Sequence, residues 1–319
     1  MILIFVNILF LTAGTAGLYY GADLLVKGGA ALARRLGVSS MVIGLTLVAS
    51  ATSAPELVVS LRAGLEGNSG IALGNVIGSN ICNIALILGL CACVAPVYTE
   101  RKWFRLDLPV MVLSAALLAL FCFRGKPLDF RHGLLFLCGL AGYTFRNLRQ
   151  SRKEEAARRE NSPEPPPPCS VLRALLLIGI GLGLLLGGAE IFLRGTLFFA
   201  RLLGIPDAVA GLTVVAVGTS LPELATSLVA AFKGERDIAI GNVVGSNIFN
   251  ILGIVGAVTL LTPLRNYSMD LVDLGMLLLC SAGLPLLMRS GWRLARIEGA
   301  LMLLLYCAYT VQLILCHGR

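Results

Sequence analysis

The chain has 319 residues, of which 57% are hydrophobic and only 14% are charged. Soluble domains carry about a quarter of charged residues, so this composition excludes an ordinary soluble core and predicts a polytopic membrane protein. The net charge of +8 is explained by basic loops on one side of a membrane. It gives no reason to expect nucleic acid as a partner.

Apolar runs of about 20 residues, long enough to cross a bilayer as helices, recur along the whole chain. The opening run, MILIFVNILFLTAG, has no basic residue before Lys27, so it lacks the basic start of a secretory signal. We expect it to be the first membrane helix, retained in the mature protein. We predict ten spans, at about residues 3–33, 40–63, 70–95, 105–123, 130–147, 171–202, 207–231, 238–262, 270–288 and 295–316.

A charged, proline-rich segment separates the fifth span from the sixth. Residues 146–170 mix charges of both signs and then hold four consecutive prolines, which is typical of a short, solvated, flexible linker. We therefore divide the chain into a first repeat at 1–147, a cytoplasmic linker at 148–170 and a second repeat at 171–319.

The distribution of basic residues predicts the orientation. If the N-terminus is outside, the inner loops carry 17 Lys and Arg residues and the outer loops carry 7. Because cytoplasmic loops are enriched in Lys and Arg, both termini are expected outside. The location predicted is the plasma membrane, which is the inner membrane if the source is a bacterium.

The two halves of the chain are copies of each other. The segment GLTLVASATSAPELVVSL, from Gly44, aligns without a gap with GLTVVAVGTSLPELATSL, from Gly211, and 27 of the 46 positions from these glycines onward are identical. Because each copy holds five spans, an odd number, equivalent helices run in opposite directions. We predict an all-α integral membrane fold of ten transmembrane helices in two inverted five-helix repeats. Such repeats place substrate sites near the bilayer midplane and work by alternating access.

The copies share nearly all the polar residues within the aligned spans, whereas a mere packing scaffold would share only apolar residues. Two spans of each copy place them on one helix face, at spacings of three, four and seven residues in the first span and of four residues in the next. The first such set is Ala49, Thr52, Ser53 and Glu56, with its copy Ala216, Thr219, Ser220 and Glu223. The second is Asn75, Ser79 and Asn83, with its copy Asn242, Ser246 and Asn250. Asp23 and Glu190 are also equivalent, and both a gating role and a helix-end packing role remain open for them.

These polar groups offer oxygen ligands, which suit hard cations such as Ca²⁺ and Na⁺. Pro55 and Pro222 each displace the carbonyl four residues earlier, at Ala51 and Gly218, and such carbonyls can bind an ion at membrane depth. An intramembrane carboxylate costs about 2.5–3.5 kcal/mol on insertion scales, so the two glutamates are expected to be functional. Their charge of −2 balances one Ca²⁺, two Na⁺ or two protons, and a site that alternates between these loads is an exchanger.

The stretches ATSAPEL and GTSLPEL, each followed by GNVxGSNIxNI, resemble the two alpha-repeats of the sodium/calcium exchanger family within the calcium:cation antiporters. The resemblance is to small prokaryotic members and covers both repeats. It implies ten helices in a 5+5 inverted repeat, four central ion sites, sliding of the first and sixth spans, and exchange of three Na⁺ for one Ca²⁺. The ion ligands that it implies are Glu56, Glu223, Thr52, Thr219, Ser53, Ser220, Ser79, Ser246, Asn83, Asn250 and the backbone carbonyls of Ala49 and Ala216.

Two positions depart from the pattern of that family. Ala51 stands where the family usually has glycine, as Gly218 still does, which would stiffen the first half of the site slightly. Asn250 stands where some members, including potassium-dependent ones, have aspartate. The missing carboxylate argues against co-transport of K⁺.

The function predicted is secondary antiport that extrudes Ca²⁺ from the cytoplasm using inward Na⁺. No HExxH, P-loop or GxSxG motif occurs in a suitable context, so we predict a transporter and no enzyme, with no cofactor. Its partners would be Ca²⁺, Na⁺ and the lipid bilayer, and it would function as a monomer. A Ca²⁺/H⁺ or other cation/proton antiporter is the first alternative. A cation channel and a non-transporting scaffold are alternatives from other classes.

Overall fold

The computed structural model describes residues 2–98, 104–161, 170–204, 216–265, 267, 269–289 and 292–317. In the first half a long helix precedes two spans that are interrupted by π-helical turns, and two further helices follow. These elements are α1 (Ile2–Leu36), α2 (Ser40–Ile43), η1 (Gly44–Val48), α3 (Ala49–Thr52), α4 (Ala54–Leu65), α5 (Ser69–Ile81), η2 (Cys82–Leu88), α6 (Gly89–Val94), α7 (Asp107–Phe123) and α8 (Phe130–Asn161).

Within its described residues, the second half repeats the order of the corresponding elements of the first half. Its elements are α9 (Val171–Leu202), α11 (Ala216–Thr219), α12 (Leu221–Phe232), α13 (Arg236–Ile248), η5 (Phe249–Val255), α14 (Gly256–Leu261), α15 (Leu271–Arg289) and α16 (Arg296–His317). A short antiparallel ribbon, in which Val97 of β1 (Val97–Tyr98) pairs with Leu294 of β2 (Arg293–Leu294), joins the two halves. Each predicted span has a helix at its place, although residues 207–215 of the seventh lie outside the described part of the chain.

Within the described residues, six helices are long and apolar enough to cross a membrane. The pair formed by residues 40–52 and 54–65 makes a seventh when it is counted as one span, bent by 49°. The remaining predicted spans correspond to α7, to α8 and to α12 with the adjoining α11. The protein is thus an all-helical membrane protein, and the count of ten spans stays a prediction.

Helix α8 differs from the predicted organisation, because it continues to Asn161 and so enters the segment expected to be a flexible linker. Residues 152–160 are all Arg, Lys, Glu or Ala, and these are good helix formers. Gln150 also donates a hydrogen bond to Glu154 one turn later, at 2.9 Å. The flexible-linker expectation was therefore wrong for residues 148–161, and residues 162–169 lie outside the described part.

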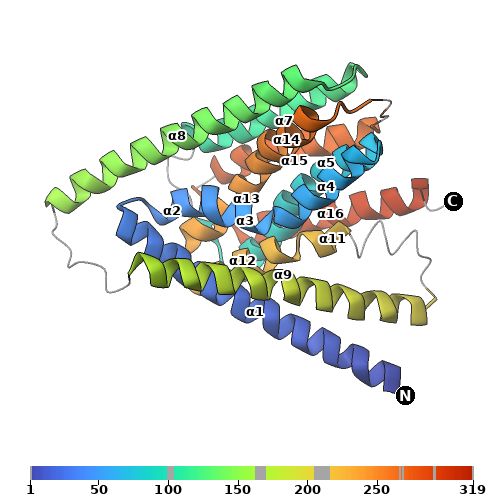
Figure 1. Ribbon diagram of the computed structural model, residues 1–319, viewed down its shortest axis with the longest axis horizontal. Helices are drawn as coiled ribbons and strands as arrows, with labels where there is room; N and C mark the ends of the chain where they lie inside the picture. The colour runs from blue at the N-terminus through green and yellow to red at the C-terminus, as the bar shows by residue number, and fades with distance from the viewer. Residues whose placement is uncertain are drawn as a thin grey trace.

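Helices α1 and α9 lie side by side, across one face of the remaining helices (Figure 1). Their backbones approach closely at glycines: a Cβ on Gly188 would lie 2.8 Å from the nitrogen of Leu18, and one on Gly21 would lie 2.6 Å from the nitrogen of Leu185. Behind this pair, the spans at residues 69–94 and 236–261 are the most buried candidate spans. The centre of the protein is therefore formed by the spans that hold the repeated polar motifs.

Candidate ion-binding site

Each half contains one broken helix, and the two breaks occur at equivalent residues. Ser53 separates α3 from α4, and Ser220 separates α11 from α12. Proline follows within the first turn in both places, where its missing N–H would have no helical partner in any case. This local geometry places Glu56 and Glu223 in the first turns of α4 and α12, next to the breaks.

The two breaks face each other through a reciprocal pair of hydrogen bonds. Ser53 donates from its hydroxyl to Oε1 of Glu223 at 2.8 Å. Ser220 donates from its hydroxyl to Oε1 of Glu56 at 3.1 Å. Both glutamates are fully buried. The serine of each copy thus holds the carboxylate of the other copy, and a single centre contains both carboxylates.

Two asparagines attach the neighbouring helices to this centre. Asn75 donates from Nδ2 to the carbonyl of Glu56 at 3.1 Å and to the hydroxyl of Ser60 at 2.9 Å. Asn242 repeats both contacts, to the carbonyl of Glu223 at 3.3 Å and to Ser227 at 2.9 Å. The two asparagines therefore fix the positions of α4 and α12.

Ser60 and Ser227 were not singled out from the sequence, although a signal existed. They are identical in the two copies, and each lies four residues after a glutamate, which is one helical turn. Both are fully buried. Their hydroxyls accept from the asparagines, so they support the centre from the adjoining turn.

The predicted ligands lie mostly at this buried centre. Thr52 donates to Oδ1 of Asn242 at 3.1 Å, and the carbonyl of Ala49 accepts from Thr52 at 3.3 Å and from Ser246 at 3.5 Å. Thr219 is half-buried, and Ala216 begins α11 but its side chain lies outside the described part. The other predicted ligands are all buried: Ser53, Glu56, Ser79, Asn83, Ser220, Glu223, Ser246 and Asn250.

Among the described residues, several oxygens of this centre have no hydrogen-bond partner. They are Oε2 of Glu56, Oε2 of Glu223 and the amide oxygens of Asn83 and Asn250. A buried acceptor without a partner costs about 1–3 kcal/mol, and such groups call for an unseen water or ion. Carboxylate and amide oxygens are ligands that hard cations prefer, so this donor set fits the binding of Na⁺ or Ca²⁺.

The electrostatic balance of the centre also favours a bound cation. Among the described residues, the buried charged side chains are Glu56, Glu223 and Asp107, and no basic side chain is buried. Two carboxylates in a low-dielectric region repel each other unless a positive charge lies near them. A cation bound between them would supply that charge.

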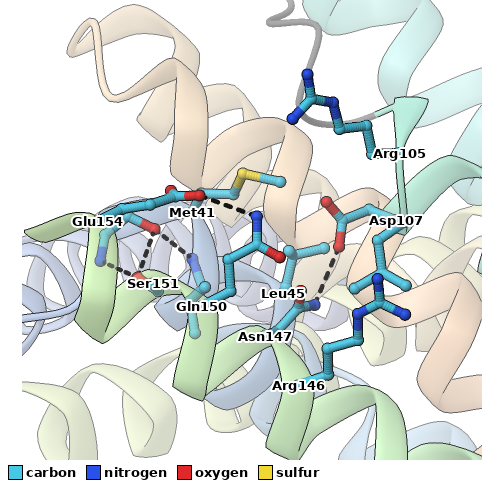
Figure 2. Close-up of a pocket in the computed structure, with 12 residues that line it drawn as sticks. Met41, Leu45, Arg105, Asp107, Arg146, Asn147, Gln150, Ser151 and Glu154 are labelled. Atoms are coloured by element: carbon cyan, nitrogen blue, oxygen red, sulfur yellow. Dashed lines mark hydrogen bonds between the residues drawn. The ribbon is translucent and has the colours of Figure 1, made fainter.

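A second polar pocket, of about 210 Å³, is separate from this centre and lies between α7, α8 and the start of the second span (Figure 2). Asp107, which lines this pocket, accepts hydrogen bonds from Asn147 at 3.0 Å and from Tyr143 at 2.9 Å. The second copy repeats the contact between tyrosine and aspartate, since Tyr309 donates to Asp273 at 2.8 Å. None of the predicted ligands lines this pocket. The hydrogen-bonded pair of tyrosine and aspartate joins two helices in each half.

Comparison with known proteins supports one family over nearly the whole chain. The model of the sodium/calcium exchanger protein family matches residues 6–149 and 173–315. Sodium/calcium exchanger MaX1 of Methanosarcina acetivorans is 36% identical, over 98% of this chain and 99% of its own length. Inner membrane protein YrbG of Escherichia coli is 37% identical, over 85% of this chain and 87% of its own length.

Solved structures of the sodium-calcium exchanger NCX_Mj share the fold. NCX_Mj soaked with zero Na⁺ and Ca²⁺ matches with a TM-score of 0.82 and 34% identity, over 97% of this chain and 99% of that one. NCX_Mj soaked with 2.5 mM Na⁺ and 10 mM Sr²⁺ matches with the same TM-score and 32% identity, over 99% of this chain and 100% of that one. The chain therefore belongs to the sodium/calcium exchanger protein family, and it is a membrane antiporter of cations rather than an enzyme.

Proposed function

We propose that this protein exchanges Na⁺ for Ca²⁺ by alternating access and extrudes Ca²⁺ from the cytoplasm. The observation that supports this proposal best is the reciprocal bonding of Ser53 to Glu223 and of Ser220 to Glu56. It brings one carboxylate from each half into a common buried centre. The relatives named sodium/calcium exchanger agree with this choice of ions.

Under this proposal, the cargo is bound by the repeated oxygen donors. The ligands are Glu56, Glu223, Thr52, Thr219, Ser53, Ser220, Ser79, Ser246, Asn83, Asn250 and the carbonyls of Ala49 and Ala216. The charge of the two glutamates is balanced by one Ca²⁺ or by monovalent cations in its place. Moving the two carboxylates without any cation would cost much more, and this difference couples the two fluxes.

The proposed architecture is ten membrane helices in two inverted five-helix repeats, with both termini outside and the segment between the repeats in the cytoplasm. The equivalent breaks at Ser53 and Ser220 support the inverted relationship, because each half presents the same groups to the other. We place the protein in the plasma membrane, as a monomer that needs no cofactor.

Transport by the purified protein in liposomes tests this function. Liposomes loaded with Na⁺ should take up Ca²⁺ when outside Na⁺ is low, and uptake should stop when Na⁺ is equal on both sides. Gradients of Na⁺, K⁺ and H⁺ are varied separately. Uptake driven by a pH gradient and indifferent to Na⁺ would replace the proposal with Ca²⁺/H⁺ exchange, and uptake without counter-transport would indicate a channel.

Variants at the centre complete this experiment. Glu56→Gln and Glu223→Gln should each abolish exchange, because each removes half of the charge that balances Ca²⁺. Glu154→Gln, which changes an exposed carboxylate on α8, is the matched control and should exchange as the wild type does. Normal exchange by either central variant would contradict the proposed site.

A further inference from the structure

Asp23 joins helix α1 to the core of the protein. Its carboxylate forms ion pairs with Lys27 on the same helix, at 2.8 Å, and with Lys233, the C-cap residue that follows α12. The side chain of Asp23 is only 13% exposed. The pair formed by Asp23 and Lys233 therefore ties α1 to the helix that positions Glu223.

The equivalent pair is missing from the other half. The copy of Asp23 is Glu190 on α9, but the copy of Lys233 is Glu66, at the end of α4. Glu190 pairs with Arg194 and Glu66 pairs with Arg62, each at 2.8 Å and within its own helix or its cap. Among the described residues, no ion pair joins α9 to α4.

The packing of the two long helices, α1 and α9, differs between the halves in the same way as the ion pairs do. Helix α1 packs against α12, whereas no comparable contact joins α9 to α4 within the described residues. Thr226 on α12 is fully buried, but its copy Val59 on α4 is 37% exposed, and the neighbouring Val58 is 64% exposed. Within the described residues, α12 is thus covered by α1, whereas α9 does not cover α4.

From this asymmetry we infer that Asp23 and Lys233 are a positioning pair that favours the state in which α1 covers α12, and that they set the side from which the ion site is reached. The inference rests on the proposed function. Two identical inverted halves would give two states of equal free energy. An ion pair present in one half alone removes that equality, because uncovering α12 must break it. In the proposed orientation, the pair keeps cytoplasmic access closed.

The test compares the half-saturating Ca²⁺ concentration on the two membrane faces, in right-side-out and inside-out vesicles. Lys233→Gln removes the pair and should lower the cytoplasmic value relative to the outer one by about fivefold, equivalent to about 1 kcal/mol. Lys233→Arg keeps the charge and should restore the wild-type ratio. Glu66→Lys supplies the cation that the second pair lacks. Its pairing with Glu190 would favour the state in which α9 covers α4, so this change should shift the ratio in the same direction as Lys233→Gln. Glu66→Gln, which adds no cation, is its matched control.

Hydrogen exchange gives a second readout that does not need transport. In Lys233→Gln the amides of α12 should exchange faster than in the wild type, and in Glu66→Lys the amides of α4 should exchange more slowly. A lower ratio in both variants, with faster hydrogen exchange in α12 of Lys233→Gln and slower hydrogen exchange in α4 of Glu66→Lys, supports the inference. An unchanged ratio with unchanged hydrogen exchange in Lys233→Gln, or ratios that shift in opposite directions in the two variants, would overturn it. Absence of Na⁺-dependent Ca²⁺ flux in the wild type would contradict the proposed function alone. The hydrogen-exchange data would still show whether Asp23 and Lys233 favour the state in which α1 covers α12.

Discussion

Ser53 donates a hydrogen bond of 2.8 Å to Glu223, a residue 170 positions later in the chain. The return contact, from Ser220 to Glu56, has a length of 3.1 Å. Neither half could form these bonds alone, because each serine needs the carboxylate of the other copy. The proposed ion-binding centre is therefore a property of the paired halves.

This reciprocity predicts similar effects of Ser53→Ala and Ser220→Ala. Each change removes one charge-assisted hydrogen bond, worth about 1.5–3 kcal/mol, and one hydroxyl ligand. Each should raise the Ca²⁺ concentration for half-maximal exchange by about tenfold or more. A liposome flux assay measures this, with Ser162→Ala, in the proline-rich segment between the halves, as the control. A large effect of one substitution without the other would contradict a shared centre.

The asparagines of the centre should separate binding from stability. Among the described residues, the amide of Asn250 has no hydrogen-bond partner, so Asn250→Ala should leave the unfolding temperature without cations nearly unchanged and should weaken cation binding. Asn242 donates to Ser227 and to the carbonyl of Glu223, so Asn242→Ala should lower the unfolding temperature. Thermal unfolding with and without Ca²⁺ measures both effects. Equal destabilisation by the two changes would show that Asn250 has a structural role.

The close approach of α1 and α9 predicts a strong dependence on glycine. A Cβ at Gly188 would lie 2.8 Å from the nitrogen of Leu18, whereas one at Gly187 would meet nothing within 4 Å. Gly188→Ala should therefore destabilise the protein by about 1–3 kcal/mol, as overpacking does, and Gly187→Ala should not. Thermal unfolding in the same detergent compares the two. Equal unfolding temperatures would mean that the two helices are not packed as described.

Exchange should be independent of K⁺. The described centre holds two carboxylates, and Asn250 supplies an amide where a third carboxylate would bind a further cation. Replacing K⁺ by choline on both sides of the liposome should leave the Na⁺-driven Ca²⁺ flux unchanged. A flux that rises with K⁺ at a constant Na⁺ gradient would show that two carboxylates are sufficient for K⁺ coupling.

Much of the site could be predicted because duplication repeats the polar residues in register. The two copies have the same polar residues around Glu56 as around Glu223. The burial of both glutamates in a common centre therefore follows from the inverted repeat. The family is confirmed by comparisons that cover both halves. The ion ligands themselves stay a prediction. It is supported by oxygens that have no hydrogen-bond partner among the described residues, such as the amide oxygen of Asn83.

Other features depend on contacts that periodicity does not contain. Asn75 lies on the same helix face as Ser79, yet it binds the backbone of α4 through its amide nitrogen. The π-helical turns at Cys82–Leu88 and Phe249–Val255 place Asn83 and Asn250 where a regular helix would not. The extension of α8 to Asn161 was missed because charge was interpreted as a sign of solvation, whereas alternating charges also favour an exposed helix.

The central claim is that Glu56 and Glu223, from opposite halves, together hold one cation. Ca²⁺ titration of the purified protein by calorimetry, with and without Na⁺, tests it most directly. We predict Ca²⁺ binding that Na⁺ displaces competitively, and loss of that binding in Glu56→Gln and Glu223→Gln alike, with Glu154→Gln unchanged. Wild-type Ca²⁺ affinity in either central variant would contradict the claim.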